Sequence, residues 1–452
     1  MNGFKGKNKG QGSAWRYLAV GYLCIILFGS VLLILPFATA EGESTSYLNA
    51  LFTSASATCV TGLVPYDTAT HWSLFGQIVI LCLIQLGGVG FMTFVSVLFL
   101  MIRRGVGVSE RRAMMQTYGG REKIGLKKLI RHILLGTAIA EITGAALLCI
   151  RFVPDFGGAR GVWYAVWHSV SAFCNAGFDL MGEVSAPFAS LTAYARDPLV
   201  SLVVSLLIVF GGIGFCVWGD VFECKFRVKK FQLFTKVVLS MTGILLVLST
   251  GLYLLFERAN PAYADYTFGE KLLCAFFNAA TARTAGFSTT DPALLSESGY
   301  LLTVILMFIG ASSGSTAGGI KVTTFAVIVM GMFAAFRGRR DINIGKRRID
   351  PSLVGQALAI FAAYLMLALL ATLTICTVDG VSFKAVLFET VSALGTVGLS
   401  LSLTPLLSAA SRVILIMLMY LGRVGVLTFA LALRRRHKTS AVRYPVDLLF
   451  IG

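Results

Sequence analysis

The sequence predicts an all-α polytopic membrane protein, with eight transmembrane helices arranged as four helix–re-entrant loop–helix repeats around a pseudo-fourfold axis. Three observations support this prediction. Of the 452 residues, 56% are hydrophobic and only 13% are charged, which is too apolar for a soluble fold. Long apolar runs recur along the chain, and one short phrase ending in glycine occurs four times. Because the runs lack the period-two alternation of a barrel strand, a transmembrane β-barrel is excluded.

Eight apolar runs are near or above the length that indicates a transmembrane helix. At about 1.5 Å per residue, each can cross the roughly 30 Å hydrocarbon core of a bilayer. The predicted spans cover residues 17–35, 72–102, 129–153, 199–218, 237–256, 300–336, 353–376 and 413–433.

The placement of basic residues predicts the orientation of the chain. A formal net charge of +17 also occurs in nucleic-acid-binding proteins. Here, however, 29 of the 39 Lys and Arg residues lie in five segments, at 5–16, 103–131, 225–236, 337–348 and 434–443. The positive-inside rule places these segments in the cytoplasm. We therefore expect both termini in the cytoplasm, contact of the basic segments with anionic membrane lipid, and no nucleic-acid partner.

The four connections on the predicted outer side share one phrase, which recurs at about a quarter of the chain length. The four phrases align without gaps on glycines 62, 177, 286 and 398. A short apolar segment precedes each glycine, at residues 46–58, 162–173, 268–282 and 383–394. These segments are too short to cross the bilayer, so we expect half-helices that enter and return on the outer side.

Non-helical backbone at membrane depth is costly unless protein or water receives its amides and carbonyls. Four such loops therefore predict a shared watery axis, along which backbone carbonyls and helix C-termini stabilise a dehydrated cation. A turn or close helix packing explains one loop glycine equally well, but four copies in phase favour a pore. The predicted filter residues are Val60, Thr61, Gly62, Asn175, Ala176, Gly177, Thr284, Ala285, Gly286, Thr396, Val397 and Gly398.

Three residues next to these loops are interpreted differently. Cys59 and Cys174 are interpreted as packing residues, because a hard alkali cation prefers oxygen to sulfur. Arg283 occupies the equivalent position of the third copy. Lining the path would place its charge against the ion, so we expect it to pair with an acid behind the loop.

The sixth apolar run, residues 300–336, would form a helix of about 55 Å, nearly twice the membrane core, so it must break. The break is predicted at residues 310–319, which are rich in glycine and small hydroxylated residues of poor helix propensity. We interpret this segment as a movable gate beneath the filter; a GxxxG packing face is the alternative. The predicted gate residues are Gly310, Ala311, Ser312, Ser313, Gly314, Ser315, Thr316, Ala317, Gly318, Gly319, Lys321 and Arg423.

Arg423 belongs to this set because it is the only charged residue between Arg412 and Arg434, well inside the last span. An intramembrane charge indicates a functional site. We expect it to place positive potential below the filter and to pair with the gate. A structural salt bridge is the alternative.

Residues for catalysis or metal binding are lacking in the predicted spans. Glu141 and Glu389 are expected to be isolated, and His168 is expected to pack or to cap a helix. A rocking secondary transporter would need inverted repeats and a pair of broken helices, whereas only one strongly broken span is expected here. The sequence therefore predicts a transport protein that is not an enzyme and carries no covalently bound cofactor.

These loop phrases resemble the Trk/Ktr/HKT superfamily of potassium transporters, and most closely its Ktr-type bacterial membrane subunit. The resemblance includes the sequences VTGL at 60–63, NAGFD at 175–179, RTAGF at 283–287 and GTVGLS at 395–400. It also includes the glycine-rich segment 310–321, LGRVG at 421–425, and YP and IG in the C-terminal tail. Trk-type subunits usually carry two further N-terminal spans, and their absence from this sequence favours the Ktr branch.

The resemblance implies potassium uptake across the bacterial inner (plasma) membrane, often with sodium dependence, through one pore in each subunit of a homodimer. It also implies control by a cytosolic regulatory ring of the KtrA-like, RCK type, with nucleotide bound on that partner only. A sodium-selective member of the same superfamily, or a secondary cation symporter of another type, is the alternative.

The repeats divide the chain into six parts. A basic cytoplasmic N-terminus (1–15) and a cytoplasmic C-terminal tail (435–452) flank repeats at 16–104, 105–224, 225–340 and 341–434. The second repeat includes the preceding cytoplasmic linker, and the third includes the predicted gate.

Overall fold

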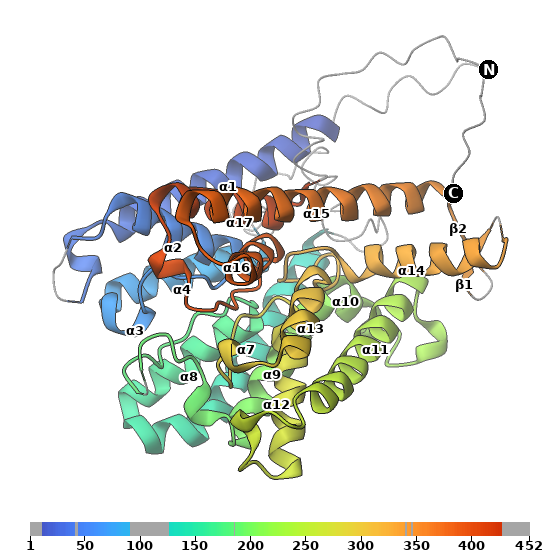
Figure 1. Cartoon of the computed structure of the whole chain (residues 1–452). Coiled ribbons are helices and arrows are strands. Elements are labelled where there is room, and N and C mark those ends of the chain that lie inside the picture. The colour runs from blue at the N-terminus through green and yellow to red at the C-terminus, as the bar shows by residue number, and fades with distance from the viewer. Residues whose placement is uncertain are drawn as a thin grey trace.

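The computed structural model describes residues 11–40, 44–90, 126–184, 186–339, 341–344 and 347–426. Most of the basic N-terminus, most of the basic segment 103–131 and the C-terminal tail lie outside these residues, together with the predicted lipid contacts there. The fold that the structure describes is mostly helical, as the sequence predicts (Figure 1).

The helices occur in the same order four times: a long helix, a short helix, a non-helical segment and a further helix. The long helices are α1 (Gln11–Leu33), α7 (Leu126–Phe156), α11 (Leu233–Phe256) and α15 (Ser352–Asp379). The short helices are α2 (Tyr47–Cys59), α8 (Gly158–Phe173), α12 (Phe268–Thr281) and α16 (Phe383–Gly395). The returning helices are α4 (Leu74–Val89), α9 (Pro198–Ile213) with α10 (Phe215–Glu223), α13 (Glu297–Phe308) with α14 (Val322–Phe336), and α17 (Ala409–Val424).

Smaller elements connect these helices. Helix α3 (Thr68–His71) and the single-turn helices η1 to η6 lie in the connections, the latter at Pro36–Ala38, Thr192–Tyr194, Val228–Lys230, Pro261–Tyr263, Pro292–Leu294 and Thr404–Leu406. Strands β1 (Ile342–Ile344) and β2 (Arg347–Ile349) form an antiparallel hairpin between α14 and α15. The all-α prediction did not include this hairpin, whose short strands leave little periodic signal.

Capping residues determine where three of the four short helices begin. Ser46 and Ser382 accept hydrogen bonds from the backbone amides of the residues three positions on, at the starts of α2 and α16. Thr267 and Glu270 form a complete capping box at the start of α12. The predicted half-helices therefore agree with the observed short helices to within a few residues at each end.

The helices form a closed circular arrangement. Each returning helix packs against the short helix of the next group: α4 on α8, α9 on α12, α13 on α16, and finally α17 on α2. Figure 1 shows the consequence at the ends of the chain, where α17 lies between α1 and α15. Two large clusters of buried apolar side chains fill the spaces between the groups.

The expectation of only one strongly broken span is wrong. Helix α9 ends at Gly214, where φ is 97°, and α10 continues at an angle of 87°. Helices α4 and α17 end in the same way, at Gly90 (φ 91°) and Gly425 (φ 88°). Each of these glycines closes a Gly-x-x-Gly or Gly-x-Gly phrase, and a positive φ, which glycine adopts without steric cost, ends the α-helix.

Because of these breaks, fewer of the described helices are long enough to cross a membrane than the eight predicted spans. Among the described residues, four helices are long and apolar enough to cross a membrane, or five if α9 and α10 form one span. The four are the long helices α1, α7, α11 and α15. The returning helices are shorter because each is interrupted.

Candidate ion pathway

The four predicted loop glycines meet in one ring. A methyl group added to Gly62 would lie 2.6 Å from the carbonyl oxygen of Ala176, the residue before Gly177. A methyl group on Gly177 would lie 2.7 Å from Ala285 O, and one on Gly286 would lie 2.6 Å from Val397 O. A methyl group on Gly398 would overlap the carbonyl oxygen of Thr61, which closes the ring. We call residues 60–62, 175–177, 284–286 and 396–398 the ring segments.

The backbone of each ring segment alternates in handedness. Its first residue is left-handed, with φ of 57° at Val60, 57° at Asn175, 69° at Thr284 and 51° at Thr396. Its glycine again has positive φ, between 69° and 98°, while the middle residue does not. Alternation of this kind turns successive peptide planes, so that neighbouring carbonyls can point to the same side. For a β-branched residue the left-handed conformation costs about 1–2 kcal/mol, a strain typical of functional sites.

Backbone amides of the ring segments donate hydrogen bonds to groups behind the ring. At the end of α2, Val60 N donates to Ala57 O (3.1 Å) and Thr61 N donates to Ser56 O (2.8 Å). Ser56 Oγ accepts from Gly62 N at 3.0 Å. The two backbone bonds form the Schellman pattern of a helix C-terminus. The same two bonds end α8 and α16, and Ser392 Oγ accepts from Gly398 N at 3.0 Å. With the amides bonded behind the ring, the carbonyls are free to face the axis.

A cavity of about 530 Å³ lies on one side of the ring. All four ring glycines line it, together with Asp67, Asp179 and Asp291, and its described lining contains no Lys or Arg. Burial raises the pKa of Asp179 to about 7, so the negative potential, which raises the local concentration of cations, comes mainly from the carboxylates of Asp67 and Asp291. We call this cavity the vestibule.

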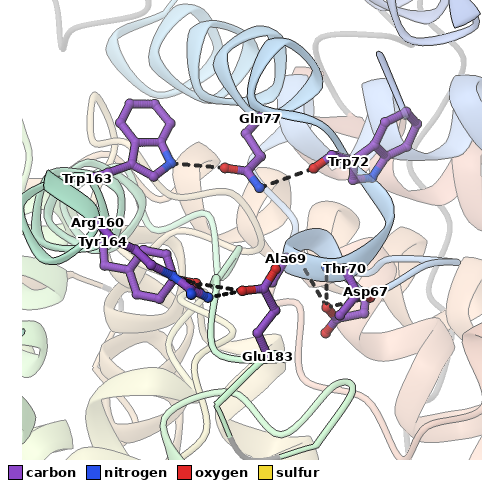
Figure 2. Close-up of polar contacts among 9 residues, drawn as sticks. All are labelled: Asp67, Ala69, Thr70, Trp72, Gln77, Arg160, Trp163, Tyr164 and Glu183. Atoms are coloured by element: carbon purple, nitrogen blue, oxygen red, sulfur yellow. Dashed lines mark hydrogen bonds and ion pairs between the residues drawn. The ribbon is translucent and has the colours of Figure 1, made fainter. Parts of the chain in front are cut away.

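Polar contacts between the first two groups hold the wall of the vestibule (Figure 2). Asp67 caps α3 by accepting from the amides of Ala69 and Thr70, both at 3.1 Å, and it accepts from Phe188 N at 2.9 Å. Nearby, Trp163 Nε1 donates to Gln77 Oε1 at 2.9 Å, which ties α8 to α4.

An ion pair lies next to this contact. Arg160 pairs with Glu183 and also donates from Nη2 to the hydroxyl of Tyr164 at 2.9 Å, as Figure 2 shows. It links the start of α8 to the connection that follows the second ring segment.

On the other side of the ring, residues 309–321 form a loop between α13 and α14. We call it the inner loop. Ser312 N donates to Gly212 O at 3.0 Å, and Phe215 N donates to Gly314 O at 3.0 Å. These bonds attach the loop to the break between α9 and α10. The predicted break in residues 310–319 is therefore present, and its backbone is bonded to protein as membrane depth requires.

The inner loop contacts two ring segments that are not neighbours in the ring. Thr316 Oγ1 donates to Asn175 Oδ1 at 3.2 Å, in the second segment. Gly318 lies against Thr396 in the fourth segment, where a methyl group on the glycine would overlap the threonine hydroxyl. Since the second and fourth segments face each other across the ring, the loop passes beneath its centre.

Two basic side chains hold the inner loop. Arg423 Nη1 donates to the carbonyl of Thr316, and Nη2 donates to the carbonyl of Gly87 on α4. Lys321 Nζ donates to Ala317 O at 2.8 Å and to Gly318 O at 3.1 Å, within the loop itself. Two basic side chains therefore lie on the side of the ring opposite the vestibule.

Several buried polar atoms in the ring segments have no hydrogen-bond partner among the described residues. They are the hydroxyls of Thr61, Thr284 and Thr396 and the amide nitrogen of Asn175. A buried polar group without a partner costs about 1–3 kcal/mol, so a cluster of four is unusual for a purely structural region.

Arg283 does not make the predicted ion pair. It is buried, and its guanidinium donates to the hydroxyl of Thr242 at 3.4 Å, with no acid paired to it in the described part of the chain. Behind the third ring segment lies α11, whose facing residue is a threonine. No pattern in the sequence indicates which residue of α11 faces the loop.

Half-buried Glu141 and buried Glu389 each have polar hydrogen-bond partners. Glu141 accepts from Gln85 Nε2 at 3.1 Å, and Glu389 accepts from Thr404 Oγ1 at 3.0 Å and from Ser400. Glu389 thereby holds the segment that follows the fourth ring glycine. Their partners lie on other helices or in loops, where sequence spacing gives no signal.

His168 and the cysteines occupy the expected packing positions. His168 is buried and accepts from Leu180 N at 3.4 Å, with its other nitrogen 2.7 Å from Tyr164 O. Cys59 and Cys174 are buried in the apolar clusters. Cys174 also donates to Gln85 Oε1 at 3.2 Å, next to Glu141.

Known proteins are similar to this chain in sequence and in fold. The TrkH profile, described as "Cation transport protein", matches residues 21–442. The chain is 40% identical over 443 residues to the Potassium/sodium uptake protein NtpJ of Enterococcus hirae, covering 96% of each protein. It is 38% identical over 436 residues to the Ktr system potassium uptake protein B of Bacillus subtilis, again covering 96% of each.

A solved structure supports the fold. The potassium transporter TrkH of Vibrio parahaemolyticus superimposes with a TM-score of 0.72 at 18% identity, covering 96% of this chain and 87% of that chain. The resemblance to the Trk/Ktr/HKT superfamily, and within it to the Ktr type, is confirmed by these matches. The chain therefore belongs to the TrkH family of cation transport proteins, which are transporters and not enzymes.

Proposed function

We propose that this protein is the pore-forming subunit of a Ktr-type system that takes up potassium across the plasma membrane. The names of its relatives support this assignment, since one is a Ktr system potassium uptake protein and another a potassium/sodium uptake protein. The second name also supports sodium as an accompanying or alternative ion.

In this proposal the ring segments are the selectivity filter. A cation in the vestibule loses its water and is coordinated by the backbone carbonyls of the ring segments. The single observation that carries the assignment is the closed contact of Gly62, Gly177, Gly286 and Gly398, with the negative vestibule on one side. The alternating handedness of the segments supports it, because strained backbone is retained where function requires it.

The inner loop is the proposed gate. It passes beneath the ring, and Arg423 holds it there through the backbone carbonyl of Thr316. With the loop in this position the path is blocked by protein atoms and by the positive charge of Arg423. For ions to pass, the loop must leave the axis, which breaks its bonds to Arg423 and to the break between α9 and α10.

The remaining organisation follows the repeats. We propose four pore repeats, at residues 16–104, 105–224, 225–340 and 341–434, with eight spans in total. Both termini lie in the cytoplasm, the subunit forms a homodimer, and a cytosolic nucleotide-binding ring of the KtrA-like, RCK type controls the gate.

Growth rescue tests the proposed function. A bacterium lacking its own potassium uptake systems should grow at micromolar potassium when it expresses this protein with a Ktr-type cytosolic partner, assayed with and without sodium. Gly398→Ala, which places a methyl group against Thr61 O, should abolish rescue. Gly243→Ala is the matched control, because nothing lies near that position. Equal rescue by both variants at equal expression would contradict the filter assignment.

A further inference from the structure

One side chain of the ring is hydrogen-bonded to the inner loop. Thr316 Oγ1 in the loop donates to Asn175 Oδ1 in the second ring segment at 3.2 Å. Both residues are buried, at 0% and 1% exposure, so water does not compete for this bond. A residue beneath the ring therefore determines the position of a side chain that belongs to the ring.

The other three ring segments have no counterpart to this bond. The matching positions hold Val60, Thr284 and Thr396. Valine has no polar side-chain atom, and the two threonine hydroxyls have no hydrogen-bond partner among the described residues. The side-chain hydrogen bond between ring and loop is therefore specific to the second segment.

Thr316 is held in place from several directions. Its amide donates to Gly211 O at 3.4 Å, and its carbonyl accepts from Arg423. A methyl group added to Gly211 would lie 2.9 Å from the Thr316 hydroxyl and 2.9 Å from Asn175 Oδ1, so the contact is tightly enclosed. The backbone of Thr316 is therefore fixed on both sides of its side chain while the loop is in this position.

Asn175, by contrast, depends on Thr316 for its orientation. Within the described residues its Nδ2 has no hydrogen-bond partner, and Oδ1 accepts from Thr316 alone. When the loop leaves, the amide loses this bond and becomes free to rotate beside the backbone carbonyls of the ring. Its oxygen then becomes an additional, mobile ligand for a cation.

This inference rests on the proposed function and extends it to the regulation of the filter. We propose that the Thr316–Asn175 hydrogen bond couples the inner loop to the filter: it holds the Asn175 amide while the loop blocks the path, and the departing loop frees that amide as a ligand of the conducting filter. A freed amide oxygen can approach a small ion more closely than the fixed ring carbonyls can. The conducting filter should therefore discriminate potassium against sodium less strongly than a filter without the Asn175 amide, because discrimination depends on ligand number and rigidity.

Three variants of the full-length protein test the coupling in proteoliposomes, in the absence of a cytosolic partner. Thr316→Val removes the hydroxyl and keeps the shape of the side chain, whereas Thr316→Ser restores the donor. Asn175→Thr installs the residue that the third and fourth segments carry in the same left-handed conformation. Thr374→Val, at an exposed position of α15 whose hydroxyl bonds only within its own helix, controls for the substitution itself.

Potassium flux and the potassium-to-sodium flux ratio are both measured. Thr316→Val should raise potassium flux about three- to tenfold, the factor that corresponds to one hydrogen bond, and should leave the ratio unchanged, because ions pass only after the loop has released Asn175. Thr316→Ser should keep the wild-type flux, whereas Asn175→Thr should raise both the flux and the ratio. In the Asn175→Thr background, Thr316→Val should have no further effect on either quantity.

Different failures have different meanings. A ratio that Asn175→Thr leaves unchanged would overturn the role of the freed amide while leaving the loop as a gate. A Thr316→Val protein identical to wild type, or fully additive effects in the double variant, would overturn the coupling. If neither the wild type nor a variant lacking residues 310–319 conducts potassium, the proposed function itself is wrong.

Discussion

Arg423 on α17 donates a hydrogen bond to the backbone carbonyl of Thr316 in the inner loop, and a second one to Gly87 on α4. One guanidinium thus joins the last helix group, the first group and the loop of the third. A planar fork of donors suits this bridge, which the single ammonium of a lysine cannot reproduce.

Replacement of Arg423 should release the loop. Arg423→Gln removes the charge and at least one of the two bonds, and hydrogen bonds from a charged donor contribute about 1.5–3 kcal/mol. We expect potassium flux without the cytosolic partner to rise by about tenfold or more.

The Arg423→Lys variant keeps the positive charge but loses the two-armed hydrogen bonding of the guanidinium, so it tests the two effects separately. If positive potential alone restricts the ion, the lysine variant should behave like wild type. If the bridge matters, its flux should lie between those of wild type and Arg423→Gln. Unchanged uptake kinetics in the glutamine variant would contradict both roles.

Removal of residues 310–319 should have a larger effect. The deletion takes away the segment that lies beneath Asn175 and Thr396, together with both carbonyls that Lys321 binds. Cation flux in proteoliposomes should increase strongly. Lost flux in a protein that remains monodisperse in detergent would count against gating.

The serines behind the ring allow a test of filter stability. Ser56→Ala and Ser392→Ala each remove the acceptor of a ring-glycine amide, and each should cost about 1 kcal/mol of unfolding free energy and lower the potassium-to-sodium ratio. Ser171 occupies the equivalent position in the second repeat, but its hydroxyl has no partner among the described residues.

Ser171→Ala is therefore the matched control and should be close to neutral. Thermal unfolding in detergent, followed by flux measurements, checks all three variants. Equal destabilisation by the three would show that the hydroxyl bonds to Gly62 and Gly398 have no special role.

The vestibule carboxylates should act on ion binding from a distance. Asp291→Asn removes the charge of one carboxylate from the cavity wall and should raise the half-saturating potassium concentration about two- to threefold at low ionic strength. The effect should shrink in high salt, because the Debye length falls to about 3 Å at 1 M. Asp350→Asn, next to the β1–β2 hairpin, is the control outside the vestibule.

Much of this architecture can be predicted from the sequence because the chain repeats a strong local signal. The apolar segments that precede glycines 62, 177, 286 and 398 become the short helices, and the four glycines meet in the structure. Each signal is local: hydrophobicity, segment length and glycine position determine where the chain turns back.

The parts that could not be predicted depend on tertiary contacts. Val60, Thr284 and Thr396 are left-handed, although β-branched residues strongly disfavour that conformation; only the surrounding packing can impose it. The partner of Arg283 depends on which side of α11 faces the loop. The breaks after Gly90, Gly214 and Gly425 had a signal in the glycine phrases, but the phrases also fit continuous packed helices.

The packing of α17 on α2 has a consequence for how the protein is made. The loop of the first group is fully enclosed only after α17, in the last quarter of the chain, has been synthesised and has packed on α2. A nascent chain therefore has no fully enclosed ring of loop glycines until synthesis is nearly finished. A chain that ends before α17 lacks the helix that covers α2, so the ring stays open on that side.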